Sequence, residues 1–153
     1  MEAGKERDVV KYEVYEHKTQ YYETDQMGII HHSNYIRWLE SARIDYLEQL
    51  GISYRGLEER GIVSPVVTVE GRYRSMVRFG ETVRIEVKME KYNGVKLEFS
   101  YRITDRESGE LRFTGASSHC FVDRAGKIVA LKRELPEIHS LLEAKAGEER
   151  EEK

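Results

Sequence analysis

The sequence lacks the features of several large protein classes. Its single cysteine, Cys120, cannot form a disulfide within the chain and fits a reducing compartment, so we expect a cytoplasmic protein. No apolar run approaches the roughly 18–20 residues that a membrane-spanning helix needs. The opening stretch, MEAGKERD, is too charged to be a signal peptide.

Familiar enzyme motifs are also missing. The sequence contains neither the GxxxxGK[ST] of a P-loop nor the GxGxxG of a dinucleotide site. The segment Gly115–His119 approaches the GxSxG nucleophile elbow but ends without its second glycine. His119 and Cys120 are neighbours in a predicted strand, so they point to opposite faces and are unsuited to act as a pair. These absences exclude the corresponding enzyme classes, and we expect no cofactor.

Length and charge limit the remaining classes. Charged residues make up 35% of the 153 residues, and the net charge of -3 argues against a general nucleic-acid-binding protein. This length suits one domain with a substantial core. We place that domain at residues 12–143, between an N-terminal extension of residues 1–11 and a charged tail of residues 144–153 that contains GEEREEK.

One long amphipathic helix is predicted over residues 35–50. Its apolar residues fall on one side of a helical wheel: Trp38, Leu39, Ala42, Tyr46 and Leu50, widened by Ile36 and Leu47. A stripe this wide indicates a helix that is partly wrapped by a sheet. Ser33 or Asn34 is the expected N-cap, and Gly51 stands at the C′ position.

After Gly61 the hydrophobic period changes from 3.6 to 2, which indicates strands. Apolar residues alternate with polar or charged residues over 67–73, 83–90 and 97–104, and a further strand is predicted over 111–122. The pair Asn93-Gly94 is a strong hairpin signal, because a type I′ turn needs positive φ at both positions. We therefore expect antiparallel strands joined by tight turns.

Shorter elements are predicted at both ends: a first strand over 12–21, a short strand over 127–130 and a short helix over 135–142. Each strand of the sheet has one apolar face that must be covered, and the largest apolar partner is the 35–50 helix. We therefore predict an α+β fold in which an antiparallel sheet of about five strands wraps around one long central helix.

The loop before this helix carries the residues best placed for chemistry. It contains an acid, Asp25, a glycine, Gly28, and two histidines, His31 and His32, and it leads to a helix N-terminus that favours negative charge. An acid and two histidines are zinc ligands by type, but adjacent histidines rarely converge on one ion and no HExxH or CxxC accompanies them, so we predict no metal site. Taken alone, Asp25 is a loop or capping acid.

This loop and helix resemble the signature of hotdog-fold acyl-CoA thioesterases. Residues 22–35 read YETDQMGIIHHSNY and continue with Trp38-Leu39-Glu40 and Ala42-Arg43, a spacing similar to that of the 4-hydroxybenzoyl-CoA thioesterase family and its YbgC-like branch. The segment 73–81 resembles the next segment of that family, although a proline often found there is missing. The resemblance covers about residues 12–122 and agrees with the predicted fold.

The resemblance implies a mechanism and a set of site residues. The catalytic carboxylate of the family falls on Asp25, and the helix N-terminal amide that polarises the thioester carbonyl falls near His32. Such an amide stabilises the charge that builds on the carbonyl oxygen, while the carboxylate attacks the carbonyl or deprotonates a water. The expected substrate-binding residues are Tyr22, Gly28, Ile29, Ser33, Tyr35 and Trp38, and the expected CoA-binding residues are Arg72, Arg74 and Arg78, which are otherwise solvated strand residues.

Three functions stay open at this point. The first is an acyl-CoA thioesterase, the second hydrolyses acyl groups on acyl carrier protein, and the third is a non-catalytic acyl-CoA-binding module. Asp25 argues against the third, because a pure binder gains nothing from an acid beside a carbonyl. An acidic carrier protein would need a basic patch beside the pocket. Hotdog relatives dimerise through sheet edges, so we expect a homodimer or homotetramer.

Overall fold

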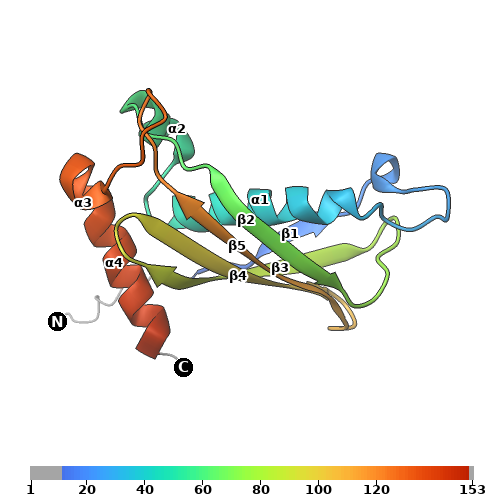
Figure 1. The fold of residues 1–153 in the computed structure, drawn as a ribbon. Coiled ribbons are helices and arrows are strands. Elements are labelled where there is room, and N and C mark those ends of the chain that lie inside the picture. The colour runs from blue at the N-terminus through green and yellow to red at the C-terminus, as the bar shows by residue number, and fades with distance from the viewer. Residues whose placement is uncertain (1–11, 152–153) are drawn as a thin grey trace.

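The computed structural model describes residues 12–151 of the chain. Figure 1 shows one sheet with a long helix along one face and a second helix across one end. The elements are β1 (Tyr15–Lys18), the 3-10 helix η2 (Tyr21–Glu23), α1 (Ser33–Gln49), α2 (Tyr54–Glu59), β2 (Val66–Tyr73), β3 (Thr82–Tyr92), β4 (Lys96–Asp105), β5 (Leu111–Cys120), α3 (Leu131–Glu134) and α4 (Pro136–Glu151). The five strands lie in the order β1-β3-β4-β5-β2, with antiparallel neighbours throughout. The predicted α+β fold, a five-stranded antiparallel sheet around one long helix, is confirmed.

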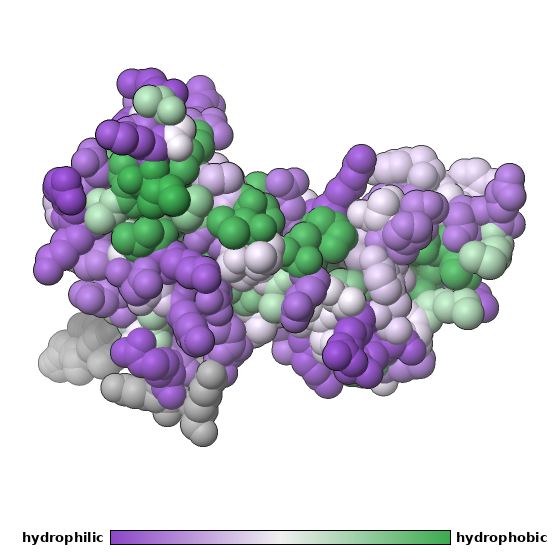
Figure 2. All heavy atoms as spheres, viewed as in Figure 1, coloured by the Kyte–Doolittle hydropathy of each residue, from purple (hydrophilic) through white to green (hydrophobic). Residues whose placement is uncertain are grey.

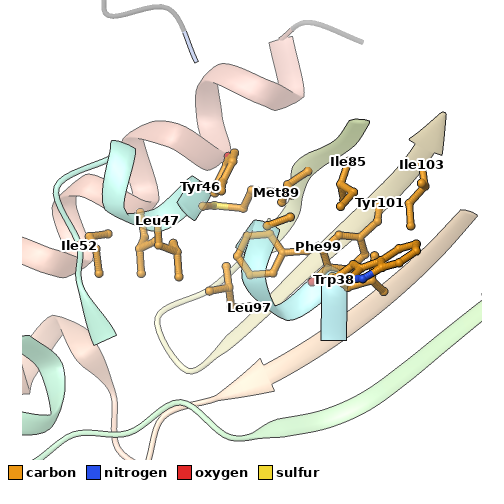
Figure 3. Close-up of a cluster of buried hydrophobic side chains, with 14 of the residues drawn as sticks. Trp38, Tyr46, Leu47, Ile52, Ile85, Met89, Leu97, Phe99, Tyr101 and Ile103 are labelled. Atoms are coloured by element: carbon orange, nitrogen blue, oxygen red, sulfur yellow. The ribbon is translucent and has the colours of Figure 1, made fainter. Parts of the chain in front are cut away.

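The core lies between the sheet and α1, as Figure 3 shows. The buried apolar residues of α1 are Tyr35, Trp38, Leu39, Ala42, Tyr46 and Leu47. The strands β3 and β4 turn alternate side chains toward them: Val83, Ile85, Val87 and Met89, then Leu97, Phe99, Tyr101 and Ile103. The apolar face of the strands, where every second residue is apolar, thus packs against the apolar stripe of α1, which repeats every 3.6 residues. Truncating one of these side chains to alanine is expected to cost about 2–5 kcal/mol.

The start of α1 differs from the prediction. The helix begins at Ser33, and its N-cap is His32, whose side chain makes no capping hydrogen bond. The expected N-caps, Ser33 and Asn34, therefore lie inside the helix, and the Asn34 amide donates instead to the carbonyl oxygen of Glu23 at 2.9 Å. At the other end Gly51 has φ of 93°, as a C′ glycine should.

The ends of the chain also differ. The first strand is only four residues long, because Thr19 ends it: its N–H and hydroxyl both donate to the carbonyl oxygen of Glu81 at 2.9 Å. The predicted 127–130 strand is reduced to an isolated bridge between Val122 and Ile128. The short helices α2 and α3 were not predicted.

The final helix runs well past its predicted end at residue 142. Leu142, Ala146 and Glu149 are buried, and Glu149 accepts a hydrogen bond of 2.5 Å from the N–H of Met89 in β3. The sequence predicts a charged tail here, but residues 144–151 continue α4, and Ala146 and Glu149 on one face of this stretch are buried. The extension at residues 1–11 lies outside the described part of the chain.

Among the strands of residues 12–151, β2 lies at one edge of the sheet and pairs only with β5. All eight of its residues are exposed, including Val66, Val67 and Val69, which are 44–56% exposed. Figure 2 shows apolar side chains along the middle of this face, over β2 and α1. An edge strand with exposed apolar residues is suited to pairing with another chain.

Candidate active site

A cavity of about 550 Å³ lies where the start of α1 meets the end of β2. Its lining residues are Asp25, Met27, Ile29, Ile30, His32, Tyr35, Tyr73, Arg74, Ser75 and Met76. They come from two stretches far apart in the sequence: residues 25–35 and residues 73–76. The lining is mainly apolar and aromatic with a few polar groups, which is typical of a small-molecule site.

Asp25 lies near the tip of a short loop that folds back on itself. Its N–H donates to the carbonyl oxygen of Ile29 at 2.8 Å, and the N–H of Gly28 donates to its carbonyl oxygen at 3.1 Å. Gly28 has φ of 79°, a conformation that favours glycine. The carboxylate oxygen Oδ1 of Asp25 accepts from the N–H groups of Met27 at 2.8 Å and Ile29 at 3.4 Å. Its Oδ2 has no hydrogen-bond partner within residues 12–151.

The second polar group at the cavity is the backbone N–H of His32. The neighbouring N–H groups are used: His31 donates to the carbonyl oxygen of Glu23 at 2.8 Å, and Ser33 donates to Nδ1 of His31 at 3.2 Å. The N–H of His32 has no acceptor in the part of the chain that the structure describes. A free N–H at a helix start, with the positive end of the helix dipole behind it, favours an oxygen that carries negative charge.

Tyr73 links this helix start to the sheet. Its hydroxyl donates to the carbonyl oxygen of His32 at 2.9 Å. Its ring packs edge-to-face against Tyr35 at 4.9 Å and Phe113 at 5.1 Å. Burial raises the pKa of Tyr73, which keeps the hydroxyl protonated as a donor. The last residue of β2 therefore fixes the position of the first turn of α1.

Two glycines make room for the aromatic wall that Tyr35, Tyr73 and Phe113 form. Gly71 in β2 lies opposite Gly115 in β5, and the ring of Phe113 lies across both. A Cβ atom at Gly71 would lie 2.2 Å from the Phe113 ring, and one at Gly115 would lie 2.8 Å from it. Phe113 in turn stacks on Tyr35 at 5.4 Å. The absence of two side chains thus allows the aromatic wall to lie directly on the strands.

The structure brings only part of the predicted site to the cavity. Asp25, Ile29, His32, Tyr35 and Arg74 line it. Both stretches of the cavity lining belong to segments that the resemblance marked, so five predicted residues converge although β2 and the loop are distant in sequence.

The other predicted substrate-binding residues lie elsewhere. The side chain of Tyr22 is 83% exposed, and Gly28 forms the turn of the loop. Ser33 bonds through its hydroxyl to the ring of a neighbouring histidine at 2.9 Å. Trp38 is buried beneath the loop and donates from Nε1 to Glu23 at 2.9 Å. These residues shape the loop and helix rather than the cavity surface.

The three arginines predicted to bind CoA lie in different places in the structure. Arg74 lines the cavity because β2 ends at Tyr73, which frees Arg74 from the alternation of the strand. Arg72 lines a different hollow of about 380 Å³ with Glu70 and Thr114. Arg78 is exposed and forms a backbone bridge with Ile29.

Several cavity residues were not predicted as site residues: Met27, Ile30, Tyr73, Ser75 and Met76. Tyr73 and Met76 lie in the segment 73–81 that the resemblance marked, which was the available signal. The pattern gave no indication of which of its side chains turn toward the loop, because β2 ends within it.

Two further features bear on the type of site. The rings of His31 and His32 stack at 4.2 Å, and no group of three or more His, Cys, Asp or Glu side chains among residues 12–151 is arranged to hold a metal ion. None of the helices in the described part of the chain has the length and hydropathy of a membrane span.

The fold is that of a hotdog domain, and the cavity lies at the start of its long helix. A family model described as the thioesterase-like superfamily matches residues 19–144. YneP of Bacillus subtilis (strain 168), a candidate acyl-CoA thioesterase by its name, is 36% identical over 127 residues, which cover 82% of this chain and 91% of YneP. The acyl-CoA thioester hydrolase YbgC of Escherichia coli O157:H7 is 27% identical over 89 residues, which cover 58% of this chain and 66% of YbgC.

Solved structures agree. The DHNA-CoA thioesterase from Staphylococcus aureus has a TM-score of 0.88 and 34% identity, with coverage of 92% of this chain and 94% of that chain. The chain therefore belongs to the thioesterase-like superfamily. The predicted family and the predicted enzyme class, a thioester hydrolase, are confirmed.

Proposed function

We propose that the protein is an acyl-CoA thioesterase that hydrolyses the thioester bond to a free carboxylic acid and CoA. One observation carries this proposal: Oδ2 of Asp25 and the N–H of His32 have no hydrogen-bond partner among residues 12–151 and belong to residues that line the same cavity. The names of YneP, YbgC and the Staphylococcus aureus enzyme support it.

The chemistry assigns one role to each group. As the thioester carbonyl carbon becomes tetrahedral, negative charge develops on its oxygen, and the N–H of His32 donates to that oxygen. The carboxylate of Asp25 either attacks the carbonyl carbon or takes a proton from the attacking water. A thiolate leaves with little help from an acid, because the pKa of a thiol is far below that of an alcohol. One carboxylate and one N–H donor therefore suffice.

The lining fits an apolar acyl group. Ile29, Ile30 and Tyr35 form one side of the cavity, and Tyr73 and Met76 contribute the other stretch of its lining. Burial of apolar atoms against these side chains supplies binding free energy of about 25 cal/mol per Å². The name of the Staphylococcus aureus relative adds DHNA-CoA to the thioesters worth testing.

We assign the phosphates of CoA to the exposed arginines Arg72, Arg74 and Arg78. Arg74 lines the cavity, so its guanidinium is the best placed of the three predicted residues. Arg78 follows in the same segment, and Arg72 lies at the separate hollow. Surface contacts of this kind are expected to weaken as salt is added.

We also propose that two copies of the chain associate, as the homodimer or homotetramer expected from the sequence. The exposed edge of β2 supports this, because an apolar edge strand is normally paired or covered. Tyr73 ends this strand and lines the cavity, so a partner seated on β2 would lie close to the site.

Two alternatives remain distinct from this proposal. Hydrolysis of acyl groups on acyl carrier protein uses the same chemistry, and the exposed arginines at residues 72–78 would serve its acidic surface equally well. A binding module without catalysis would leave Oδ2 of Asp25, which has no partner in the described part of the chain, without a role.

A thiol-release assay separates these functions. Short, long and aromatic acyl-CoAs, DHNA-CoA among them, and matching acyl carrier protein thioesters are supplied to the protein. We expect thiol release from at least one acyl-CoA with a kcat of about 1 per second or more, which is ordinary for enzymes. Faster release from the carrier protein would favour the first alternative, and tight acyl-CoA binding without release would favour the module.

A further inference from the structure

Glu23 is a carboxylate buried beside the site, two positions before Asp25, and the mechanism above gives it no role. Only 6% of the residue is exposed. Its Oε2 accepts from Nε1 of Trp38 at 2.9 Å, and its Oε1 accepts from the N–H of Gln20 at 2.8 Å. Nε2 of His17 lies 3.0 Å from Oε1 and 3.2 Å from Oε2.

Only an ionised carboxylate satisfies this environment. Two fixed donors, Nε1 of Trp38 and the N–H of Gln20, converge on one side chain, and a carboxylate is the acceptor-only group that takes both and leaves room for a hydrogen from Nε2 of His17. Burial raises the pKa of Glu23, but the hydrogen bonds with His17, Trp38 and Gln20 together lower it by more. The pKa of Glu23 therefore lies below its usual value. Since Glu23 is ionised, Nε2 of His17 must carry a hydrogen.

The backbone of Glu23 forms the base of the loop that carries Asp25. Its carbonyl oxygen accepts from the N–H of His31 at 2.8 Å and from Nδ2 of Asn34 at 2.9 Å. The loop continues outward through a bridge between Thr24 and Ile30 to Asp25. His32, which follows His31, starts the helix. The Asp25 carboxylate and the N–H of His32 therefore both lie within two residues of a backbone hydrogen bond or bridge that starts from Glu23 or Thr24.

We propose that Glu23 is a positioning residue for thioester hydrolysis: by joining β1 through His17 and α1 through Trp38, it sets the place of the Asp25 carboxylate relative to the N–H of His32. This inference rests on the proposed function. The side chain does not touch the substrate cavity, so it acts through Asp25 and the helix start.

Glu23→Gln tests this directly. Glutamine has the same size, but its NH₂ group would face His17 and one of the two other donors, Trp38 or Gln20. We expect kcat to fall by about tenfold or more, because misplacing a reacting group by about 1 Å can cost a hundredfold. KM should change by less than about twofold, since the cavity lining is intact. The matched control is Glu16→Gln in β1, beside His17. Its carboxylate lies 3.8 Å from Arg84 and 3.7 Å from Arg106 at the surface, and its kcat should be unchanged.

A spectroscopic readout shows whether the network is broken in the folded protein. Trp38 is the only tryptophan in the chain, so its indole N–H gives a single peak in a ¹H–¹⁵N spectrum. Loss of the charge-assisted bond in Glu23→Gln should move this peak to lower proton shift. The peak should keep its position in Glu16→Gln. An unmoved peak in Glu23→Gln would overturn the proposal.

A double-variant cycle separates positioning from general damage. If Glu23 acts through Asp25, then Glu23→Gln should lower the residual turnover of Asp25→Asn by less than about twofold. An equal loss in both backgrounds would overturn the positioning role while leaving Asp25 as the catalytic residue. Full turnover by Asp25→Asn alone would overturn the proposed function and this inference with it.

A second pair of variants covers the case in which Glu23→Gln does not fold. His17 lies against Trp38 with ring centroids 5.0 Å apart, so His17→Phe keeps a ring but removes a donor to Glu23. His17→Gln keeps an N–H donor. We expect kcat to fall several-fold in His17→Phe and to recover in His17→Gln. Equal kcat values in the two variants would overturn the proposal.

Discussion

The hydroxyl of Tyr73 donates a hydrogen bond of 2.9 Å to the carbonyl oxygen of His32, across 41 positions of sequence. This bond joins the end of an edge strand to the first turn of α1, and so joins the two stretches that line the cavity. The position of the His32 backbone therefore depends on where β2 lies.

Replacing the hydroxyl measures this dependence. Tyr73→Phe keeps the ring contacts with Tyr35 and Phe113 but loses the bond to His32. A net hydrogen bond is worth about 0.5–1.5 kcal/mol, so we expect kcat to fall by roughly 2- to 10-fold. Tyr92→Phe is the control, because its hydroxyl bonds to His139 far from the cavity. A kcat that is equal in the two variants would mean that the Tyr73 bond has no part in the reaction.

The carboxylate of Asp25 is tested by Asp25→Asn. The asparagine oxygen can still accept from the N–H of Met27, so the loop should keep its shape while the nucleophile or base is lost. We expect kcat to fall by about two orders of magnitude or more, without a matching loss of affinity. Turnover and melting temperature are measured on one preparation. A loop acid alone would instead lower the melting temperature and leave the turnover of the folded fraction unchanged.

The assignment of CoA to the arginines predicts a salt effect. KM for an acyl-CoA should rise with ionic strength, while KM for the matching acyl-pantetheine, which lacks the nucleotide, should respond less. Arg74→Gln should raise KM for the acyl-CoA more than Arg72→Gln does, because only Arg74 lines the cavity. Equal salt responses of the two thioesters would remove the case for all three arginines.

His119 predicts how stability depends on pH. Burial, with a smaller contribution from the charge of Arg43, lowers the pKa of His119 to about 4 from 6.5. The unfolded chain therefore binds a proton between these values that the folded chain does not. The stabilisation is fully present above pH 6.5 and is lost as the pH falls toward 4, by about 3 kcal/mol in all. Urea unfolding at pH 7 and 5 should show this loss in the native protein and a smaller one in His119→Gln. The same pH dependence of the unfolding free energy in the native protein and in His119→Gln would mean that other groups cause the loss of stability.

The edge of β2 predicts the state of association. Val67 is 56% exposed on this strand, and Val67→Lys would put a charge into any interface there. We expect light scattering to give at least twice the chain mass for the native protein and a shift toward 17.9 kDa for the variant. Val95→Lys, in the β3–β4 turn, is the matched control. A native protein that is monomeric and fully active would refute the association.

The sheet and α1 were predictable because each is specified by a local period. The alternation of apolar residues in β3 and β4 and the wide apolar stripe of α1 can each be recognised within one element. That these apolar faces bury one another follows from them. That Asp25 and His32 line one cavity was predictable for a related reason, since they lie seven positions apart in one recognisable stretch. Features that depend on contact between distant segments carried no such signal.

Glu23, Arg43 and Trp38 illustrate that limit. Glu23 is charged and appears in sequence as a loop residue, yet it is buried because His17, Gln20 and Trp38 converge on it. Arg43 is buried in the stripe of α1, where it donates to the hydroxyl of Tyr101 at 3.1 Å. Trp38 was expected at the cavity, but its indole N–H turns to Glu23. In each case the partner lies on another element.

The division of the cavity between two stretches has a consequence for how this enzyme can diverge. The reacting groups that we propose come from residues 25–32, while Tyr73 to Met76 supply the other stretch of the lining. The acceptable side chains at residues 75 and 76 are therefore not restricted by the bond-breaking step. Paralogues or laboratory libraries that vary these two positions should differ in acyl preference while keeping the same rate-determining chemistry. Substrate selectivity can therefore change largely independently of catalysis.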